Sequence, residues 1–69
     1  MTTDERILAF GKRVREVRKS KGISQERLAE MADIDRSYMG NIERGEKNIT
    51  LKKVYDICDA LKVEIRELV

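Results

Sequence analysis

The chain of 69 residues has no histidine, proline or tryptophan, and its only cysteine is Cys58. A single cysteine excludes a disulfide within the chain, and without histidine it cannot supply the four ligands of a structural zinc site. The lack of disulfides fits a reducing cytoplasm, which is where we expect the protein to act. Cys58 falls on an apolar helical stripe, so we predict a buried, inert thiol.

Aromatic residues are also scarce. They make up 4% of the chain, glycine occurs four times, and charged residues reach 41%. An all-β fold would need more aromatic, β-branched and turn residues, whereas helices with charged faces fit this composition. The length allows one small domain, residues 1–69, whose limited core favours close helix packing or oligomerisation.

Signals for membranes and catalysis are missing as well. No apolar run approaches the roughly 20 residues of a membrane span. The first residues, MTTDERILAF, contain acids and lack the apolar run of a signal peptide. There is no glycine-rich phosphate loop and no group of metal ligands, and the acidic residues scatter over helix faces, where ion pairs and solubility account for them. We therefore expect no enzyme activity, cofactor, metal, membrane contact or small-molecule ligand.

The charge is unevenly distributed along the chain. The net charge is only +2, but residues 1–27 hold eight Lys or Arg against four Asp or Glu, and residues 28–69 hold seven against nine. Such asymmetry suggests a polyanionic partner on one side. The basic face of the first predicted helix carries Lys12, Arg13, Arg15, Arg18, Lys19 and Lys21. Ordinary solvation of this face and attraction to DNA phosphates are alternative interpretations.

The spacing of apolar residues predicts helices throughout. A first helix is expected from about residue 3 to residue 21, capped by Thr2 in a capping box with Glu5 and ended by a left-handed Gly22. Its apolar face recurs at steps of three and four: Ile7, Phe10, Gly11, Val14 and Val17. A glycine on that face predicts the close approach of another helix.

Two short helices joined by a tight turn are expected next. Ser24 caps a helix that ends near residue 32, and Asp35 caps a helix that ends near residue 44, before Gly45. Asp33 lies in the turn and has to tolerate a left-handed conformation. The side chains predicted to face inward are Leu28, Ala29, Met31, Ala32, Met39 and Ile42.

The last third of the chain predicts a helix capped by Thr50 and a final turn at about residues 64–68. The helix carries an apolar stripe: Leu51, Val54, Ile57, Cys58 and Leu61. Apolar side chains also occupy the end of the chain: Val63, Ile65, Leu68 and Val69. They are expected both to close the core of one chain and to form a dimer interface.

The helix predicted at residues 35–44 has two unlike faces. Met39 and Ile42 anchor one face in the core, and the other carries Arg36, Ser37, Gly40, Asn41 and Arg44. The major groove of DNA admits a helix, and there Arg suits guanine, Asn suits adenine, and a glycine would let DNA approach closely. This stretch therefore predicts DNA recognition.

Simpler interpretations of the same helix stay open. Its polar face could be an ordinary solvated surface, and Arg44 could pair with an acid such as Glu43 or Glu46. The ring of Tyr38 could brace the helix from a half-buried position instead of contacting DNA.

Three segments carry a resemblance to a known family: Gly22–Ala29 (GISQERLA), Asp35–Met39 (DRSYM) and Ile42–Gly45 (IERG). They resemble the Cro/C1-type helix-turn-helix of phage repressors and are similar to the small controller proteins of restriction–modification systems. The resemblance extends from about residue 10 to residue 68. It implies a compact, all-α, lambda-repressor-like domain of five helices, with the helix-turn-helix at the second and third.

The resemblance also implies which residues meet DNA. Gln25 matches a phosphate-contacting residue, and Lys47 and Asn48 match loop residues that approach the backbone. The positions of the recognition helix that match are Arg36, Ser37, Tyr38, Asn41 and Arg44. Two positions depart from the family: Asp33 stands where glycine is usual, and Glu64 where Ser, Thr or Pro is usual.

We therefore predict a sequence-specific regulator of transcription that binds double-stranded DNA as a homodimer on a partly palindromic operator, in a bacterial or phage setting. A restriction–modification controller is the leading role, and a prophage-type repressor is the alternative. A protein-interaction module, such as an antitoxin, is a third possibility, but antitoxins usually need an additional segment to occupy the toxin. The operator, and the choice between activation and repression, do not follow from the sequence.

Overall fold

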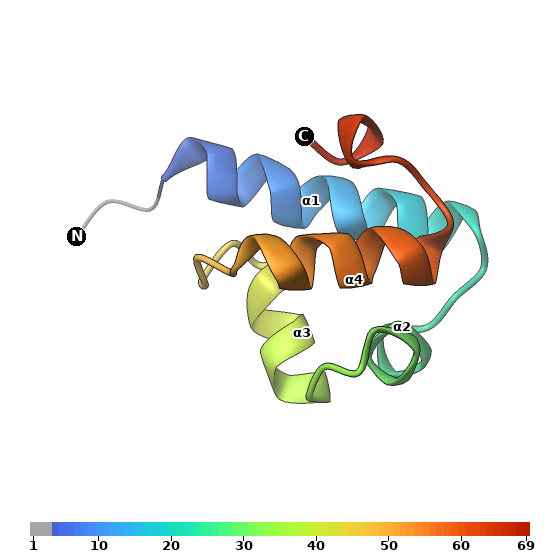
Figure 1. The fold of residues 1–69 in the computed structure, drawn as a ribbon. Coiled ribbons are helices and arrows are strands. Elements are labelled where there is room, and N and C mark those ends of the chain that lie inside the picture. The colour runs from blue at the N-terminus through green and yellow to red at the C-terminus, as the bar shows by residue number, and fades with distance from the viewer. Residues whose placement is uncertain (1–3) are drawn as a thin grey trace.

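The computed structural model describes residues 4–69, which form a small all-helical domain. Its elements are α1 (Glu5–Ser20), α2 (Gln25–Ala32), α3 (Arg36–Glu43), α4 (Leu51–Leu61) and a short 3-10 helix, η1 (Ile65–Glu67) (Figure 1). No strand occurs among the described residues, so the predicted all-α class is confirmed.

The predicted count of five helices is not confirmed, because the described residues form four α-helices and one 3-10 turn. A local capping box closes this last turn. The backbone N–H of Glu64 donates to the carboxylate of Glu67 at 2.8 Å, and the side chain of Glu64 accepts from the backbone in return. The two contacts complete one turn of three residues and do not extend it into an α-helix.

Side-chain caps set where the other helices begin. The Ser24 hydroxyl accepts from the backbone N–H of Arg27, and the Thr50 hydroxyl accepts from that of Lys53. The Asp35 carboxylate accepts from the first backbone N–H groups of α3. These three predicted caps are confirmed, because each side chain satisfies N–H groups that have no partner inside the helix.

The first helix begins differently from the prediction. Asp4 is its cap and accepts from the backbone N–H of Arg6 at 2.8 Å, so α1 starts at Glu5. The predicted cap, Thr2, lies outside the described residues. Asp33, which follows the last residue of α2, adopts the predicted left-handed conformation, with a φ of 56°.

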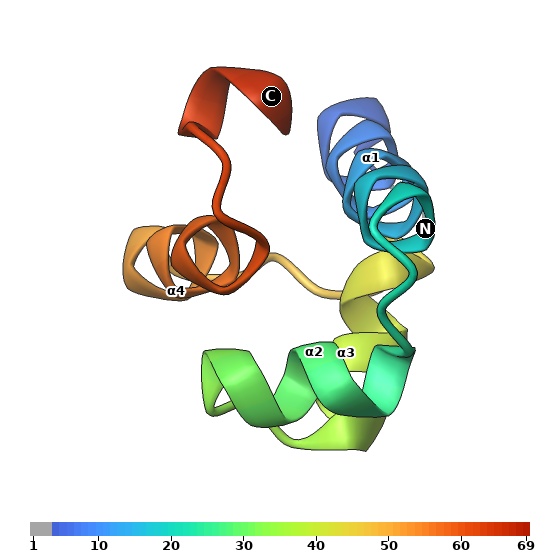
Figure 2. The ribbon, with the colours of Figure 1, turned by 90° about the vertical axis from the view of Figure 1, so that its right-hand side faces the viewer.

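The helices surround one core. Figure 2 looks nearly along α1 and α4, with α2 and α3 on one side of them and the C-terminal turn on the other. Within this arrangement α1 packs on α3, and α2 packs on both α3 and α4. The four α-helices and the residue that follows η1 supply the fully buried side chains: Val14, Leu28, Met39, Ile42, Ile57, Leu61 and Leu68.

Helices α1 and α3 approach each other closely at Gly11. A methyl group there would collide with the backbone carbonyl oxygens of Ile42 and Glu43 at the end of α3. The close approach predicted from a glycine on the apolar face is therefore confirmed.

Three side chains lie elsewhere than predicted. Met31 is 40% exposed and Leu51 is 63% exposed, although both were expected to face inward. Met31 lies about 100° around the helix from the centre of the buried stripe of α2, and Leu51 is the first residue of α4. Arg18, placed on the basic face, is only 8% exposed. Cys58 is buried as predicted, and burial raises the pKa of its thiol, which stays protonated at neutral pH.

Candidate nucleic-acid interface

The third helix is held by one face and leaves the other available. Met39 and Ile42 are 0% and 1% exposed, so they anchor α3 in the core. On the opposite side, a groove is lined by Gln25, Arg36, Ser37, Gly40, Asn41 and Arg44. The structure thus brings Gln25, the first residue of α2, beside the polar face of α3.

Gly40 leaves room for two side chains of the groove. Its Cα is buried, and an added methyl group would lie 3.1 Å from Arg44 Nη1 and 3.4 Å from Gln25 Oε1. The space that glycine leaves is therefore occupied by two side chains of the groove. Gly40 lets Arg44 and Gln25 converge beside it, and Gly40 itself lines the groove.

Arg44 has partners within the groove. Its Nε donates to Glu46 Oε2 at 3.2 Å, and its Nη2 donates to Asn41 Oδ1. Of the two acids considered from the sequence, Glu46 is the partner and Glu43 is not. Arg44 engages the Asn41 oxygen, whereas the NH₂ group of Asn41 remains available to donate. A bidentate contact with adenine uses both groups, so it would require Arg44 to release the Asn41 oxygen.

Beneath the groove lies a buried ion pair that the sequence interpretation missed. Arg18 donates from Nε to Glu43 Oε2 at 2.8 Å and from Nη2 to Glu43 Oε1 at 3.1 Å. Its Nη1 donates to the backbone oxygen of Ile23 at 2.9 Å. The side chains of Arg18 and Glu43 are 9% and 2% exposed. This pair joins α1 to the end of α3 and to the segment that leads into α2.

The buried pair also fixes Gln25. The Gln25 Nε2 donates to Glu43 Oε1 at 3.1 Å, so one of its two amide hydrogens is committed inside the protein. The other hydrogen remains available to donate to an anion such as a phosphate. A signal for the pair existed in the sequence, because Arg18 stands four residues after Val14 and so continues the apolar stripe of α1.

The remaining predicted residues lie around a second groove. Tyr38 is half-buried against the core, and Lys53 Nζ lies 5.8 Å from the centre of its ring. Ser37, Tyr38, Asn41 and Lys47 line this groove together with Lys53. Asn48 is not among the residues that line this groove.

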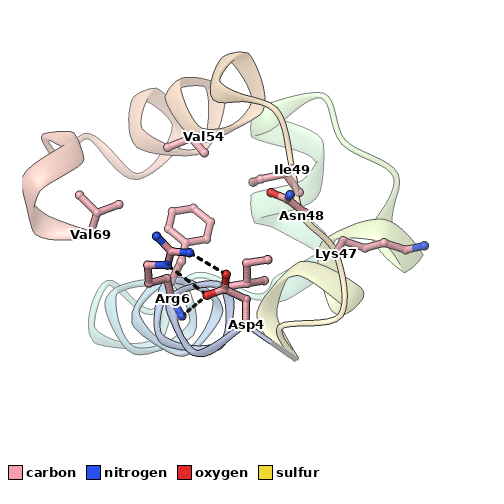
Figure 3. Close-up of a pocket in the computed structure, with 9 residues that line it drawn as sticks. Asp4, Arg6, Lys47, Asn48, Ile49, Val54 and Val69 are labelled. Carbon is pink, nitrogen blue, oxygen red and sulfur yellow. Dashed lines mark hydrogen bonds and ion pairs between the residues drawn. The ribbon is translucent and has the colours of Figure 1, made fainter. Parts of the chain in front are cut away.

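Asn48 instead borders an apolar hollow on the flank of the molecule (Figure 3). The hollow is lined by the apolar side chains Ile7, Phe10, Ile49, Val54 and Val69. At its rim Arg6 Nη2 donates to Asp4 Oδ2 at 3.0 Å, and this hydrogen bond lowers the pKa of Asp4. Lys47 also lines the hollow, although the end of its side chain points away from it in this view.

The residues predicted for a dimer interface divide between core and surface. Leu68 is 2% exposed and belongs to the core of the single chain, whereas Val69 is 78% exposed at the hollow. Val63 and Ile65 are half-buried and pack against the core.

The helices differ in the charge of the side chains in their first turns. The first turns of α1 and α2 contain Glu5 and Glu26, whereas those of α3 and α4 contain no acid. Arg36 begins α3. A cation at the positive end of a helix lowers the stability of the helix by about 0.3–1 kcal/mol.

No group of three or more His, Cys, Asp or Glu side chains in the described part of the chain could hold a metal ion. None of the helices there is long and apolar enough to cross a membrane.

Comparison with known proteins gives consistent matches. Residues 14–68 match a family profile described as helix-turn-helix. Control protein C.BamHI of Bacillus amyloliquefaciens is 44% identical over 69 residues, which covers 99% of this chain and 84% of that protein.

Solved structures agree with these matches. The restriction-modification controller protein C.AhdI from Aeromonas hydrophila superposes with a TM-score of 0.92 at 44% identity, over 96% of this chain and all of that chain. SinR, the master regulator for biofilm formation, solved in complex with DNA, superposes with a TM-score of 0.80 at 33% identity, over 86% of this chain and 95% of that chain. These similarities confirm the resemblance inferred from the sequence.

Proposed function

The chain belongs to the helix-turn-helix family, and we propose that it is a sequence-specific transcriptional regulator of the restriction–modification controller type, which binds double-stranded DNA. The observation that carries the proposal is the two-faced α3. Its apolar face is fully buried, and its polar face forms a groove with the start of α2. No catalytic step belongs to the proposal, and the site of action is the cytoplasm, where bacterial or phage DNA is found.

The groove assigns a role to each element. The α3 helix enters the major groove, while α2 crosses the backbone, as in other helix-turn-helix proteins. Arg36 and Asn41 contact base edges and Ser37 lies between them. Gln25, oriented by Glu43, donates its remaining amide hydrogen to a phosphate. Phosphate contacts set the register, and base contacts supply specificity.

A homodimer is part of the proposal. One α3 reads half of a partly palindromic operator, so two copies are needed, with the reading helices about 34 Å apart. The apolar hollow supports this arrangement, because Val69 is 78% exposed beside Val54 and Ile49. The residues of the hollow do not overlap with those of the groove between α2 and α3. A second copy seated at the hollow therefore leaves the groove between α2 and α3 uncovered.

Selection from a random pool of duplexes, followed by binding measurements over a range of salt, tests the proposal. We expect a two-fold-related consensus and an affinity that falls steeply as salt increases. Arg36→Ala should lose on the order of 1–3 kcal/mol and relax base preference at one position of each half-site. Arg66→Ala, an exposed arginine on η1, is the matched control and should bind as the unmodified protein does. No enrichment of any sequence would refute specific binding.

The neighbouring genes test the controller role separately. Genes for a restriction endonuclease and its methyltransferase beside this one would support it, whereas phage genes there would favour a prophage repressor.

A further inference from the structure

The second groove lies between α3 and the start of α4, next to the proposed reading surface. Ser37 and Asn41 line both grooves, so the two form one continuous surface. Lys47 and Lys53 supply the positive charge of the second groove, and the ring of Tyr38 lies among its lining residues. Within residues 4–69, neither lysine forms an ion pair with a carboxylate.

Lys53 differs from the lysine beside it. Lys52 Nζ lies 2.9 Å from Asp56 Oδ2, in an ion pair along the helix. Lys53 Nζ instead lies 5.8 Å from the centre of the Tyr38 ring. A cation over an aromatic face is attracted to it but keeps its full charge. The ring therefore holds the ammonium in place without neutralising it.

Two acids, Asp33 and Asp35, also border the second groove, and the Asp35 carboxylate is engaged at a helix cap. The carboxylate of Asp35 accepts the backbone N–H groups of Ser37 and Tyr38, at 2.8 and 3.4 Å. Asp33 acts on Lys52: the pKa of Lys52 is raised, first by its hydrogen bond to Asp56 and to a smaller extent by the charge of Asp33.

We propose that Lys53 binds a backbone phosphate of the DNA in the second groove, and that the ring of Tyr38 is the platform that positions it. The inference rests on the proposed DNA binding and adds a contact that the resemblance did not assign. It also changes the role of Tyr38 from a candidate DNA contact to a positioning residue. The phosphate would lie on the open side of the ammonium, near Lys47 and the Ser37 hydroxyl.

The test compares Lys53→Gln with Lys52→Gln on two duplexes of equal length: the sequence selected from the random pool and an unrelated sequence. Each lost phosphate contact lowers the salt dependence, the slope of log K against log salt, by about 0.9. A dimer loses two contacts, so Lys53→Gln should lower the slope by about 1.8. The affinity should fall by a similar factor on both duplexes, because a phosphate contact carries no base preference. Lys52→Gln should leave the slope unchanged.

Thermal unfolding separates binding from folding. Lys53 stands in the first turn of α4, where a cation is unfavourable, so Lys53→Gln should unfold at an equal or higher temperature. A normal slope for Lys53→Gln, or a loss confined to the selected sequence, would overturn the proposal.

Tyr38 requires two variants. Tyr38→Phe keeps the ring and should retain both the salt slope and the base preference of the unmodified protein. Tyr38→Leu removes the ring, and in that background Lys53→Gln should have a smaller effect than it has alone. A change of base preference in Tyr38→Phe would show that the hydroxyl contacts a base, which would overturn the positioning role.

The outcomes distinguish the inference from the function on which it rests. If Arg36→Ala loses affinity while Lys53→Gln behaves as the unmodified protein does, this inference is wrong and the proposed function stands. If the unmodified protein binds neither duplex, both are wrong.

Discussion

A single buried arginine connects folding to the reading surface. Arg18 holds both oxygens of Glu43, and Glu43 in turn accepts from Gln25 at the edge of the groove. Pairing alone is weak evidence that this arrangement stabilises the fold, because desolvation of two charges offsets their attraction. Removal of one partner is a different matter, because the other charge then stays buried without compensation.

Arg18→Met should therefore destabilise the protein by about 3–5 kcal/mol, measured as the free energy of unfolding in urea. The double variant with Glu43→Leu should recover most of this loss, because an apolar pair of similar volume is tolerated. Although the double variant should fold, it should bind every DNA sequence more weakly, because Gln25 no longer has the Glu43 carboxylate as its acceptor. Arg15→Met, at an exposed position of α1, is the control and should change stability by no more than about 0.5 kcal/mol. A loss of the same small size for Arg18→Met would contradict the role of the pair.

Two glycines on helices offer a second contrast at the residue scale. Alanine is favoured over glycine in a helix by about 1 kcal/mol. At Gly11 this gain is outweighed, because the methyl group meets the carbonyl oxygens of Ile42 and Glu43, which cannot move without shifting α3. At Gly40 the nearest atoms are the ends of two flexible side chains, Arg44 and Gln25.

We predict that Gly11→Ala lowers the free energy of unfolding, by about 1–3 kcal/mol, while Gly40→Ala leaves it equal or higher. Gly40→Ala should instead weaken DNA binding, because it pushes Arg44 and Gln25 apart. Chemical denaturation and binding to the selected duplex measure the two effects. If Gly40→Ala unfolds as easily as Gly11→Ala, the contrast between backbone and side-chain neighbours is mistaken.

At the scale of elements, helix boundaries followed from the sequence because caps are local. Ser24, Asp35 and Thr50 each bond to N–H groups within three residues, so a short stretch of sequence contains the whole cause. The start of α2 and α3, and the turn at Asp33, were predicted for this reason. Burial was less predictable, as Met31 and Leu51 show, because it depends on where neighbouring helices lie.

The partner of Arg18 illustrates the same limit. Glu43 lies 25 residues away along the chain, so no spacing within α1 could identify it. The candidate site was predictable as a set of residues on one helix face, but its internal contacts were not. The use of Gly40 and the engagement of Arg44 by Glu46 became visible only in three dimensions.

The engaged state of Arg44 leads to a prediction for α3 as a unit. Glu46 neutralises part of the charge of Arg44 and places a carboxylate where phosphates would approach. Glu46→Gln should increase affinity for all duplexes and make the salt dependence steeper, because more cationic charge then meets the DNA. Glu64→Gln is the matched control: Glu64 also pairs with an arginine, Arg66, but on η1. Unchanged or weaker binding by Glu46→Gln would contradict the masking of Arg44.

On the scale of the whole molecule, the small core limits the stability of a single chain. Leu68 is buried within that core, so the end of the chain completes the fold, and Val69, just beyond it, is exposed at the hollow. An exposed apolar side chain beside an apolar hollow can gain stability by association with a second copy. Leu68 therefore stabilises the fold of one chain, whereas the adjacent Val69 is available for association with a second copy.

Val69→Asp should convert the proposed dimer to a monomer in sedimentation experiments. Because Val69 is 78% exposed in the single chain, the substitution should leave the fold of that chain intact, and its thermal stability should fall only by what association contributed. Met31→Asp introduces the same charge at an exposed apolar position of α2 outside the hollow and should leave the dimer intact. A dimer that survives Val69→Asp would place the interface elsewhere.

The operator provides an independent measure of the same dimer. Two copies with their α3 helices one DNA turn apart require half-site centres separated by about 10 base pairs on one face of the duplex. Insertion of about five base pairs rotates one half-site by half a turn, to the far side, so the dimer can engage only one at a time. We expect the shifted duplex to bind as weakly as an isolated half-site. Val69→Asp, which is expected to be a monomer, should bind the shifted and unshifted duplexes equally. If the unmodified protein bound both duplexes alike, the two reading helices would not be held in a fixed dimer.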